Sequence, residues 1–311
     1  MNLVFLGTST FGVPSLERLL GSPHTLLAVI TQPDRPQGRG RQIAFPPVKQ
    51  IALTRHLQVL QPAHASDPEF LAELEALAPE VIVVAAYGQL LPPALLAMPP
   101  QGCVNVHASL LPKYRGAAPV NWALIRGEQV TGVTIMLIDE TLDTGPILLQ
   151  AELEIDPADN AQTLQERLAR LGAETLLPAL EGLASGTLQP IPQNHRQATY
   201  APKLRKQDGI IPWDRNAKVL ANLIRGVTPW PGAVTTHTGK LLRVWRASPM
   251  AAPRCGQPGK VVSIDALGAW VETGDGHLVL QEVQPAGGRR MDIAAYARGH
   301  ALQPGDVLGT C

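Results

Sequence analysis

Two polar residues of types that take part in catalysis, Asn105 and His107, stand two positions apart in the segment CVNVHAS, which is otherwise largely apolar. In a β-strand, residues i and i+2 project from the same face, so both side chains would point together while Val104 and Val106 pack the other way. An amide N–H can donate to an oxygen that becomes anionic in a tetrahedral intermediate, and an imidazole can bind that oxygen or accept a proton. The spacing therefore predicts a site for chemistry at a carbonyl carbon.

Acidic residues that would assist His107 occur in the later segment GVTIMLIDETLDTGP. Its candidates are Asp139, Glu140 and Asp143, and Asp143 lies in a loop marked by Gly and Pro at a strand end. A carboxylate beside the imidazole would tune the histidine and accept a proton through water. Periodicity alone does not choose among the three acids.

Several familiar site motifs do not occur in the sequence. There is no serine elbow, no H-E-x-x-H and no Cys/His cluster, and Cys103, Cys255 and Cys311 are too far apart for a disulfide framework or a metal knuckle. The segment GTSTFG (7–12) is neither a dinucleotide-binding fingerprint nor a Walker loop. These patterns favour direct transfer between two bound substrates, without a metal, a covalent nucleophile or a nicotinamide cofactor.

The segments that must position these residues alternate between strand-like and helix-like patterns over the first 180 residues. Such alternation predicts an α/β fold with a doubly wound, mostly parallel sheet, whose ligands bind near the carboxyl ends of the strands. Asp67 is a candidate N-cap. Strands are predicted at 3–7, 26–32, 58–62, 80–88, 103–109 and 132–139, and helices at 14–22, 47–56, 67–77, 118–127 and 162–186, the last with a bend near Gly172 or Pro178.

The character of the sequence changes near residue 187. Residues 187–212 hold several prolines and no sustained period, which indicates a linker. Beyond it, short strand-like segments separated by Gly, Pro and Asp predict a small antiparallel barrel or sandwich, and 311 residues suit two domains. A helix is predicted at 216–226 and strands at 233–238, 240–248, 259–265, 269–274 and 277–285.

Charge and hydropathy narrow the class of protein. The net charge is zero, but residues 1–203 hold 13 basic and 18 acidic residues (−5), whereas residues 204–311 hold 13 basic and 8 acidic (+5). A positive second half favours a polyanionic partner. No apolar run reaches the ~18 residues of a membrane span, and the first residues do not read as a signal peptide. We expect a cytoplasmic protein.

Two long stretches, NVHASLLPKYRGAAPVNWA and TGVTIMLIDETLDTGPIL, resemble the folate-dependent formyltransferases, and most closely the branch that acts on methionyl-tRNA. TQPDRPQGRGR, VVAAYGQLLP and VTPWPGA fit the same branch, and the likeness covers nearly the whole chain. The resemblance implies Asn105, His107 and Asp143 as catalytic residues, which selects one of the three acids. It also implies a folate-binding segment of Ser109, Leu110, Leu111 and Pro112, preceded by Ala108 where relatives often have glycine.

The resemblance further implies an architecture and a reaction. The expected architecture is a Rossmann-like catalytic domain at 1–189, a linker at 190–207 and an OB-like β-barrel at 208–311 that binds tRNA. The expected reaction moves the formyl group of 10-formyltetrahydrofolate to the α-amino group of methionine on initiator tRNA, in a monomer without metal. The expected tRNA-binding residues are Arg39 and Arg41 in a basic loop with Arg35, and Lys203 and Lys206 beside Arg205 in APKLRK.

Four alternatives remain open. The same site would suit a formyltransferase for a small amine, such as glycinamide ribonucleotide or an amino sugar nucleotide, although such a substrate needs neither the barrel nor the arginine loop. It would also suit hydrolysis of 10-formyltetrahydrofolate. A tRNA-binding protein without catalysis and a nicotinamide-binding protein are the alternatives from other classes.

Overall fold

The computed structural model describes residues 1–37, 42–253 and 256–309. The chain forms two compact units that are not continuous in sequence. The first unit comprises Met1–Gly116, Val130–Glu154 and Gln165–Ala201, and the second comprises Ala117–Gln129, Ile155–Leu164 and the chain from Pro202 onward.

The first unit is built on a sheet whose order, in the described part of the chain, is β5-β2-β1-β6-β7-β8-β9. Strands β5 to β7 in this order are parallel, β8 runs antiparallel to β7, and β9 runs antiparallel to β8. The bounds are β1 Asn2–Gly7, β2 Thr25–Ile30, β5 Val59–Leu60, β6 Val81–Ala85, β7 Cys103–His107, β8 Val130–Leu137 and β9 Ile147–Glu154.

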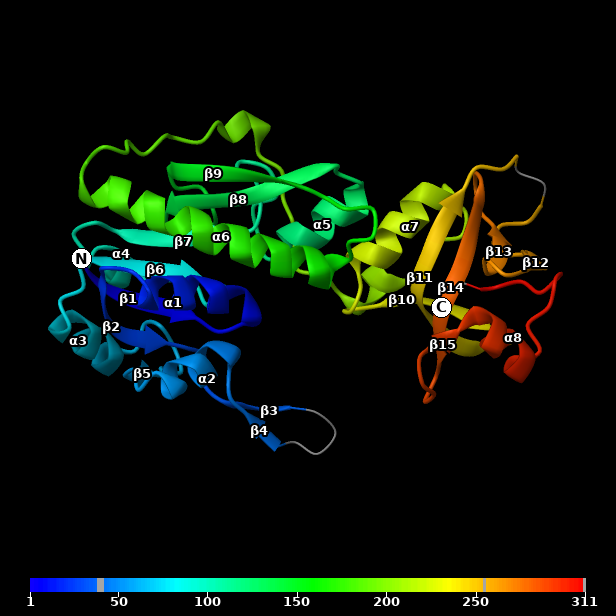
Figure 1. Ribbon diagram of the computed structural model, residues 1–311, viewed down its shortest axis with the longest axis horizontal. Helices are drawn as coiled ribbons and strands as arrows, with labels where there is room; N and C mark the ends of the chain where they lie inside the picture. Colours follow the sequence, from blue (N-terminus) through cyan, green and yellow to red (C-terminus); the bar gives the residue numbers. More distant parts are fainter. Residues whose placement is uncertain (38–41, 254–255, 310–311) are drawn as a thin grey trace. The chain divides into compact units, whose positions relative to one another are not determined.

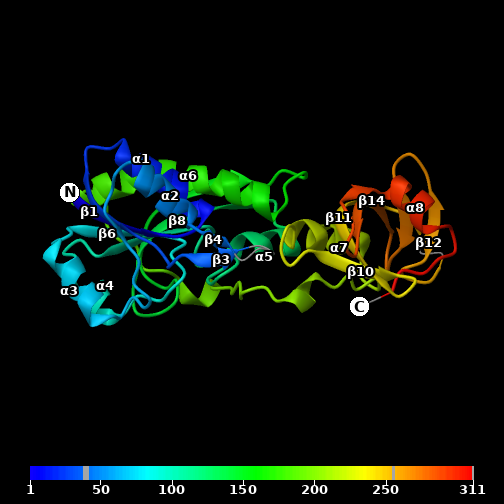
Figure 2. The ribbon, with the colours of Figure 1, turned by 90° about the horizontal axis from the view of Figure 1, so that it is seen from below.

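Helices cover both faces of this sheet. Helices α1 (Val13–Leu20) and α6 (Ala161–Ala184) lie over one face, and α3 (Pro68–Ala76) and α4 (Pro93–Leu96) over the other (Figure 2). The central strand β6 reads VIVVA and is buried at every position, as expected for a strand covered on both sides. This Rossmann-like, doubly wound arrangement confirms the predicted fold class.

Helix α6 is one continuous helix (Figure 1). Its range includes Gly172 and Pro178, the two positions near which a bend was expected. Gly172 is explained by packing against the sheet, because a Cβ there would lie 2.7 Å from Cγ1 of Val106. The valine side of β7 is therefore covered by α6. The opposite side of the same strand carries Asn105 and His107.

Some elements of the structure were not predicted from the sequence. Two short antiparallel strands, β3 (Arg35–Gln37) and β4 (Gln42–Ala44), flank the basic loop. Strand β9 and helix α4 were also not expected. Helix α2 spans Pro47–Thr54, close to its predicted range. Asp67 does stand at the N-cap position of α3, but its carboxylate accepts from the backbone N–H of His64 and bonds no helix N–H.

The second unit contains an antiparallel sheet in the order β10-β11-β14-β13-β12, with β15 paired to β14. The C-terminal segment bridges both edges of this sheet, because Gly309 pairs with Thr236 and Val307 pairs with Lys260. This connection matches the predicted OB-like barrel. The strands are β10 Ala233–His237, β11 Lys240–Met250, β12 Val261–Ile264, β13 Ala269–Glu272, β14 His277–Pro285 and β15 Met291–Asp292.

Helices also accompany this sheet. Helix α5 (Pro119–Arg126) packs on α7 (Ala217–Gly226), and Trp122 adds to the apolar core beneath the strands. A third helix, α8 (Ile293–His300), was not predicted; the Asp292 side chain caps it by accepting from the N–H of Ala294. Within the described residues, no helix is both long and apolar enough to cross a bilayer.

Burial makes Cys103 chemically inert in the folded protein. The side chain lies in the core beside Leu95, and this burial raises the pKa of the Cys103 thiol to about 12. At pH 8 roughly one thiol in 10⁴ would be ionised. In a variant with Cys255→Ser and Cys311→Ser, we expect almost no reaction with a disulfide reagent until denaturant is added. Rapid labelling of the native variant would contradict the packing around β7.

Candidate active site

His107 ends β7 and is only 6% exposed. Its Nε2 lies 3.1 Å from the backbone oxygen of Tyr114. A carbonyl oxygen only accepts, so Nε2 carries the proton of the neutral ring and Nδ1 presents a lone pair. The ring is thus held in the tautomer that can take up a proton at Nδ1.

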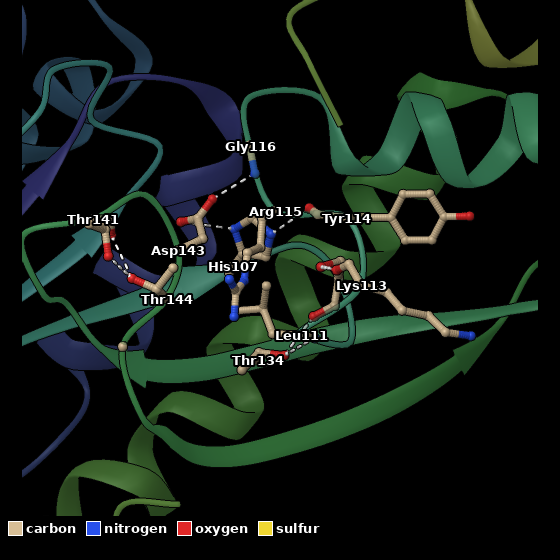
Figure 3. A network of polar contacts seen from close by, with 12 residues as sticks. His107, Leu111, Lys113, Tyr114, Arg115, Gly116, Thr134, Thr141, Asp143 and Thr144 are labelled. Carbon is tan, nitrogen blue, oxygen red and sulfur yellow. Dashed lines mark hydrogen bonds and ion pairs between the residues drawn. The ribbon is translucent and has the colours of Figure 1, made fainter. Parts of the chain in front are cut away.

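Asp143 faces that nitrogen. Its Oδ1 lies 3.6 Å from Nδ1 of His107, and its Oδ2 accepts a 2.8 Å hydrogen bond from the backbone N–H of Gly116 (Figure 3). The carboxylate is 12% exposed, and the Asp143 backbone has a φ of +54°. Asp is among the residues that tolerate this left-handed conformation, and such backbone angles cluster at functional sites. The charge is therefore placed to stabilise a proton on Nδ1.

Asp143 does not reach His107 simply because their strands end at the same edge of the sheet. Because β8 is antiparallel to β7, it ends beside Cys103, whose backbone oxygen accepts from the N–H of Ile138. His107 is at the other end of β7. The loop between β8 and β9 must fold back along the sheet to bring Asp143 to His107.

The rival acids of this loop have other positions. The Asp139 carboxylate accepts from the backbone N–H of Thr141 and, at 2.6 Å, from the hydroxyl of Thr144. Glu140 is exposed. Asp139 therefore stabilises the turn, and only Asp143 of the three acids is paired with His107.

Asn105 is partly exposed on the same side of β7 as His107. The structure gives its side-chain amide no hydrogen bond to any described residue, whereas the backbone is paired with Val84 and Met136 on the two neighbouring strands. A polar side chain on a rigid strand without a protein partner is available to a ligand. Within the described part of the chain, the expected oxyanion donor thus has no partner for its side-chain N–H, on the side of β7 that carries His107.

Residues 109–112, expected to bind folate, form a segment fixed to β8 and β9. Thr134 donates to the backbone oxygen of Ser109 and accepts from the N–H of Leu111, and Gln150 donates to both Thr134 and Leu111. The Ser109 hydroxyl is buried and donates to the backbone oxygen of Lys113. Leu110 and Pro112 are partly exposed, so they offer the accessible apolar surface of this segment.

Two residues near the pair were not indicated by the sequence patterns. Arg115 and Gln193 are buried, and the Gln193 amide bonds Arg115 on one side and the backbone of Asp143 on the other. Gln193 stands in the predicted linker, where neither periodicity nor a motif distinguished it. The only signal was an unusual density of polar residues in QNHRQATY.

Gly116 is required where it stands. Its φ is +121°, and a Cβ would lie 2.7 Å from the backbone oxygen of Ala201. We expect Gly116→Ala to lower the free energy of unfolding by about 1–3 kcal/mol and to displace the N–H that binds Asp143. Gly186→Ala is the matched control, because Gly186 also has a positive φ, but a Cβ there would meet no heavy atom within 4 Å beyond its chain neighbours. Urea unfolding compares the variants, and equal losses would contradict the predicted clash.

The residues expected to bind tRNA are only partly placed. Lys203, Arg205 and Lys206 are exposed, while Leu204 between them packs into the core of the second unit. Arg35 is exposed at the start of β3. Arg39 and Arg41 lie outside the described residues.

Comparison with known proteins identifies the family. Residues 1–180 match the family model of the formyl transferases, and residues 203–301 match the model of their C-terminal domain. A methionyl-tRNA formyltransferase of Acetivibrio thermocellus is 47% identical, over 99% of this chain and 100% of its own length. Another, from Caldanaerobacter subterraneus subsp. tengcongensis, is 49% identical with the same coverage.

Solved structures share the fold at low identity. An N-formyltransferase from Helicobacter canadensis, in complex with folinic acid and dTDP-3-aminofucose, has a TM-score of 0.68 at 18% identity, covering 89% of this chain and 97% of that one. HypX from Aquifex aeolicus, in complex with tetrahydrofolic acid, has a TM-score of 0.65 at 18% identity. The match covers 95% of this chain and 46% of HypX. The family models, and the relatives that match over their whole length, show that this chain belongs to the formyl transferase family, in the branch of the methionyl-tRNA formyltransferases.

Proposed function

We propose that this protein transfers the formyl group of 10-formyltetrahydrofolate to the α-amino group of methionine carried by initiator tRNA. The observation that carries the proposal is the His107–Asp143 pair beside the free amide of Asn105, in a chain that aligns end to end with methionyl-tRNA formyltransferases. The identity of the acceptor rests on these relatives. The chemistry rests on the three side chains.

The roles of the three residues follow from their atoms. Asn105 donates its side-chain N–H to the formyl oxygen as that oxygen becomes anionic. His107 takes the proton released by the attacking amine at Nδ1, the nitrogen left free by the bond from Nε2 to Tyr114. Asp143 stabilises the resulting imidazolium from 3.6 Å. The same proton is then available to the nitrogen of the leaving folate.

The amine must lose a proton to react. A free α-amino group has a pKa near ~8, so much of it is protonated at neutral pH. The neutral amine attacks, and a base at the site accepts the proton that its nitrogen loses in that step. His107 and Asp143 supply that base. In the described residues, no three His, Cys, Asp or Glu side chains are grouped to hold a metal ion.

The partly exposed Leu110 and Pro112 fit an aromatic ring system, so residues 109–112 would form one wall of the folate site. The exposed cations Lys203 and Lys206, with Arg39 and Arg41, would contact tRNA phosphates. Such contacts are weakened by salt whatever the tRNA sequence. The proposed domain division is a catalytic domain at 1–189, a linker at 190–207 and a tRNA-binding barrel at 208–311. The protein is proposed to be a cytoplasmic monomer.

One assay separates this function from its alternatives. The protein is incubated with 10-formyltetrahydrofolate and, in separate reactions, methionyl initiator tRNA, uncharged tRNA, glycinamide ribonucleotide, an amino sugar nucleotide or buffer. We expect formyl-methionine on the charged initiator tRNA alone. Formylation of a small amine but not of the charged tRNA would overturn the proposal, and folate turnover in buffer alone would indicate a hydrolase.

A further inference from the structure

Gln193 is a buried hydrogen-bond hub next to the catalytic loop. It is 6% exposed, and its Oε1 accepts from Arg115 through Nε at 3.1 Å and Nη2 at 2.6 Å. Its Nε2 donates to the backbone oxygens of Asp143, at 3.0 Å, and Gly145, at 2.7 Å. Both lone pairs of the amide oxygen and both N–H groups are therefore used. A single amide fixes the loop on both sides of Thr144.

Arg115 has an unusual environment for a buried charge. It is 2% exposed, and its side-chain partners are Gln193 and Nδ1 of His195, 3.2 Å from Nη2. No carboxylate of a described residue lies within 4 Å of its guanidinium. Burying a charge without a counter-ion is costly, and an apolar side chain of similar volume would stabilise a core at least as well. A contribution to stability alone does not account for an arginine here.

The backbone of Arg115 is held by the same distant segment. Its N–H donates to the backbone oxygen of Thr199 at 2.9 Å, and its own oxygen accepts from the N–H of Ala201 at 2.7 Å. The side chain and the backbone of one residue are thus tied to residues 193–201. These contacts anchor the short loop that follows β7 to that segment.

The neighbours of Arg115 contact both members of the catalytic pair. Tyr114, before it, offers the oxygen that binds His107, and Gly116, after it, offers the N–H that binds Asp143 (Figure 3). The connections therefore form a closed ring. From Asp143 the ring passes through the Gln193 side chain to Arg115, and through Gly116 back to the Asp143 carboxylate.

We propose that Gln193 and Arg115 are positioning residues for formyl transfer, which set the distance and orientation of the Asp143 carboxylate relative to His107. This inference rests on the proposed function, because it assigns the two residues a role in that reaction. Neither side chain needs to contact a substrate. Their effect passes through the backbone of the Asp143 loop.

The variant Gln193→Glu tests the donor side of the amide separately from its acceptor side. The new carboxylate still accepts from Arg115 and gains an ion pair with it, but it cannot donate to Asp143 or Gly145. We expect kcat to fall by about 10- to 100-fold, the scale of a misplaced catalytic group. KM for 10-formyltetrahydrofolate and for methionyl-tRNA should stay within about threefold, because Gln193 is not among the residues proposed to bind either substrate.

Gln189→Glu is the matched control. It places the same substitution four residues earlier, at an exposed glutamine whose side-chain amide, among the described residues, hydrogen-bonds only to the backbone oxygen of Gly186. We expect wild-type kinetics. If neither this control nor the wild type formylates methionyl-tRNA, the proposed function is wrong; if both do and Gln193→Glu matches them, only the positioning role is wrong.

A second background distinguishes positioning from a general structural effect. In a protein that already carries Asp143→Asn, adding Gln193→Glu should lower kcat by less than about threefold. The two effects are not additive, because both residues act through the same carboxylate. The same full loss in both backgrounds would overturn the proposal. Arg115→Lys, which keeps the charge but loses the planar fork, should give the same pattern and serves if Gln193→Glu does not fold.

Discussion

Asp143→Asn should lower kcat for formyl transfer by about 10²- to 10⁴-fold. The amide oxygen can still accept from Gly116, so the loop keeps its place. In that orientation the amide NH2 faces Nδ1 of His107 and donates to the lone pair that must take the proton. The variant therefore loses the negative charge and also blocks the base.

The measurement is steady-state formylation of methionyl-tRNA, with thermal unfolding as a check on folding. Glu140→Gln is the matched control, because it removes one negative charge from the same loop at an exposed side chain. The control should retain wild-type kcat. Similar losses in both variants would mean that the net charge of the loop matters and that the geometry at His107 does not.

Asn105→Ala should lower kcat by about 10²- to 10³-fold, the usual cost of removing one oxyanion donor. The free energy of unfolding of this variant should differ from that of the wild type by less than about 0.5 kcal/mol. The Asn105 amide makes no hydrogen bond to a described residue and is partly exposed. Loss of activity without loss of stability identifies a residue whose partner is the substrate.

Asn105→Asp refines this test. The carboxylate has nearly the same shape as the amide but no N–H, and its negative charge would repel a developing oxyanion. We therefore expect it to be slower than Asn105→Ala. Should the aspartate variant approach wild-type kcat, Asn105 would not be the donor. Equilibrium binding of 10-formyltetrahydrofolate to both variants would show whether the effect lies in the chemical step.

Much of the site follows from local sequence. The alternation of β7 places Asn105 and His107 on one side of a strand, and a five-residue strand between helices allows little else. The parallel core of the sheet was equally clear, because apolar runs such as VIVVA indicate strands covered on both faces. These features depend on residues close together in the chain.

The remaining features depend on distant contacts. The choice of Asp143 over Asp139 could not be made from periodicity, because it depends on Asp139 turning back to Thr141 and Thr144. Strand β9 begins directly after a Gly-Pro turn and is only half buried, so its pattern was weak. Gln193 lies 50 residues from Asp143, and no local signal reports a bond between them.

The alternating pattern also did not reveal the direction of β8. A parallel strand would have ended near His107, but the antiparallel strand ends near Cys103, and the Asp143 loop has to fold back along the sheet to His107. Strand direction is set by the pairing of β8 with β9 and β7, which the apolar pattern does not encode.

The central claim is that His107 and Asp143 act as one proton-accepting unit at a single carbonyl. A double-mutant cycle between His107→Ala and Asp143→Asn, measured as the single-turnover rate of formyl transfer to methionyl-tRNA, tests it most directly. We predict that each single variant is slowed by at least about 100-fold and that the double variant is within about threefold of the slower one. Losses that multiply in the double variant, or a single variant that reacts at the wild-type rate, would contradict it.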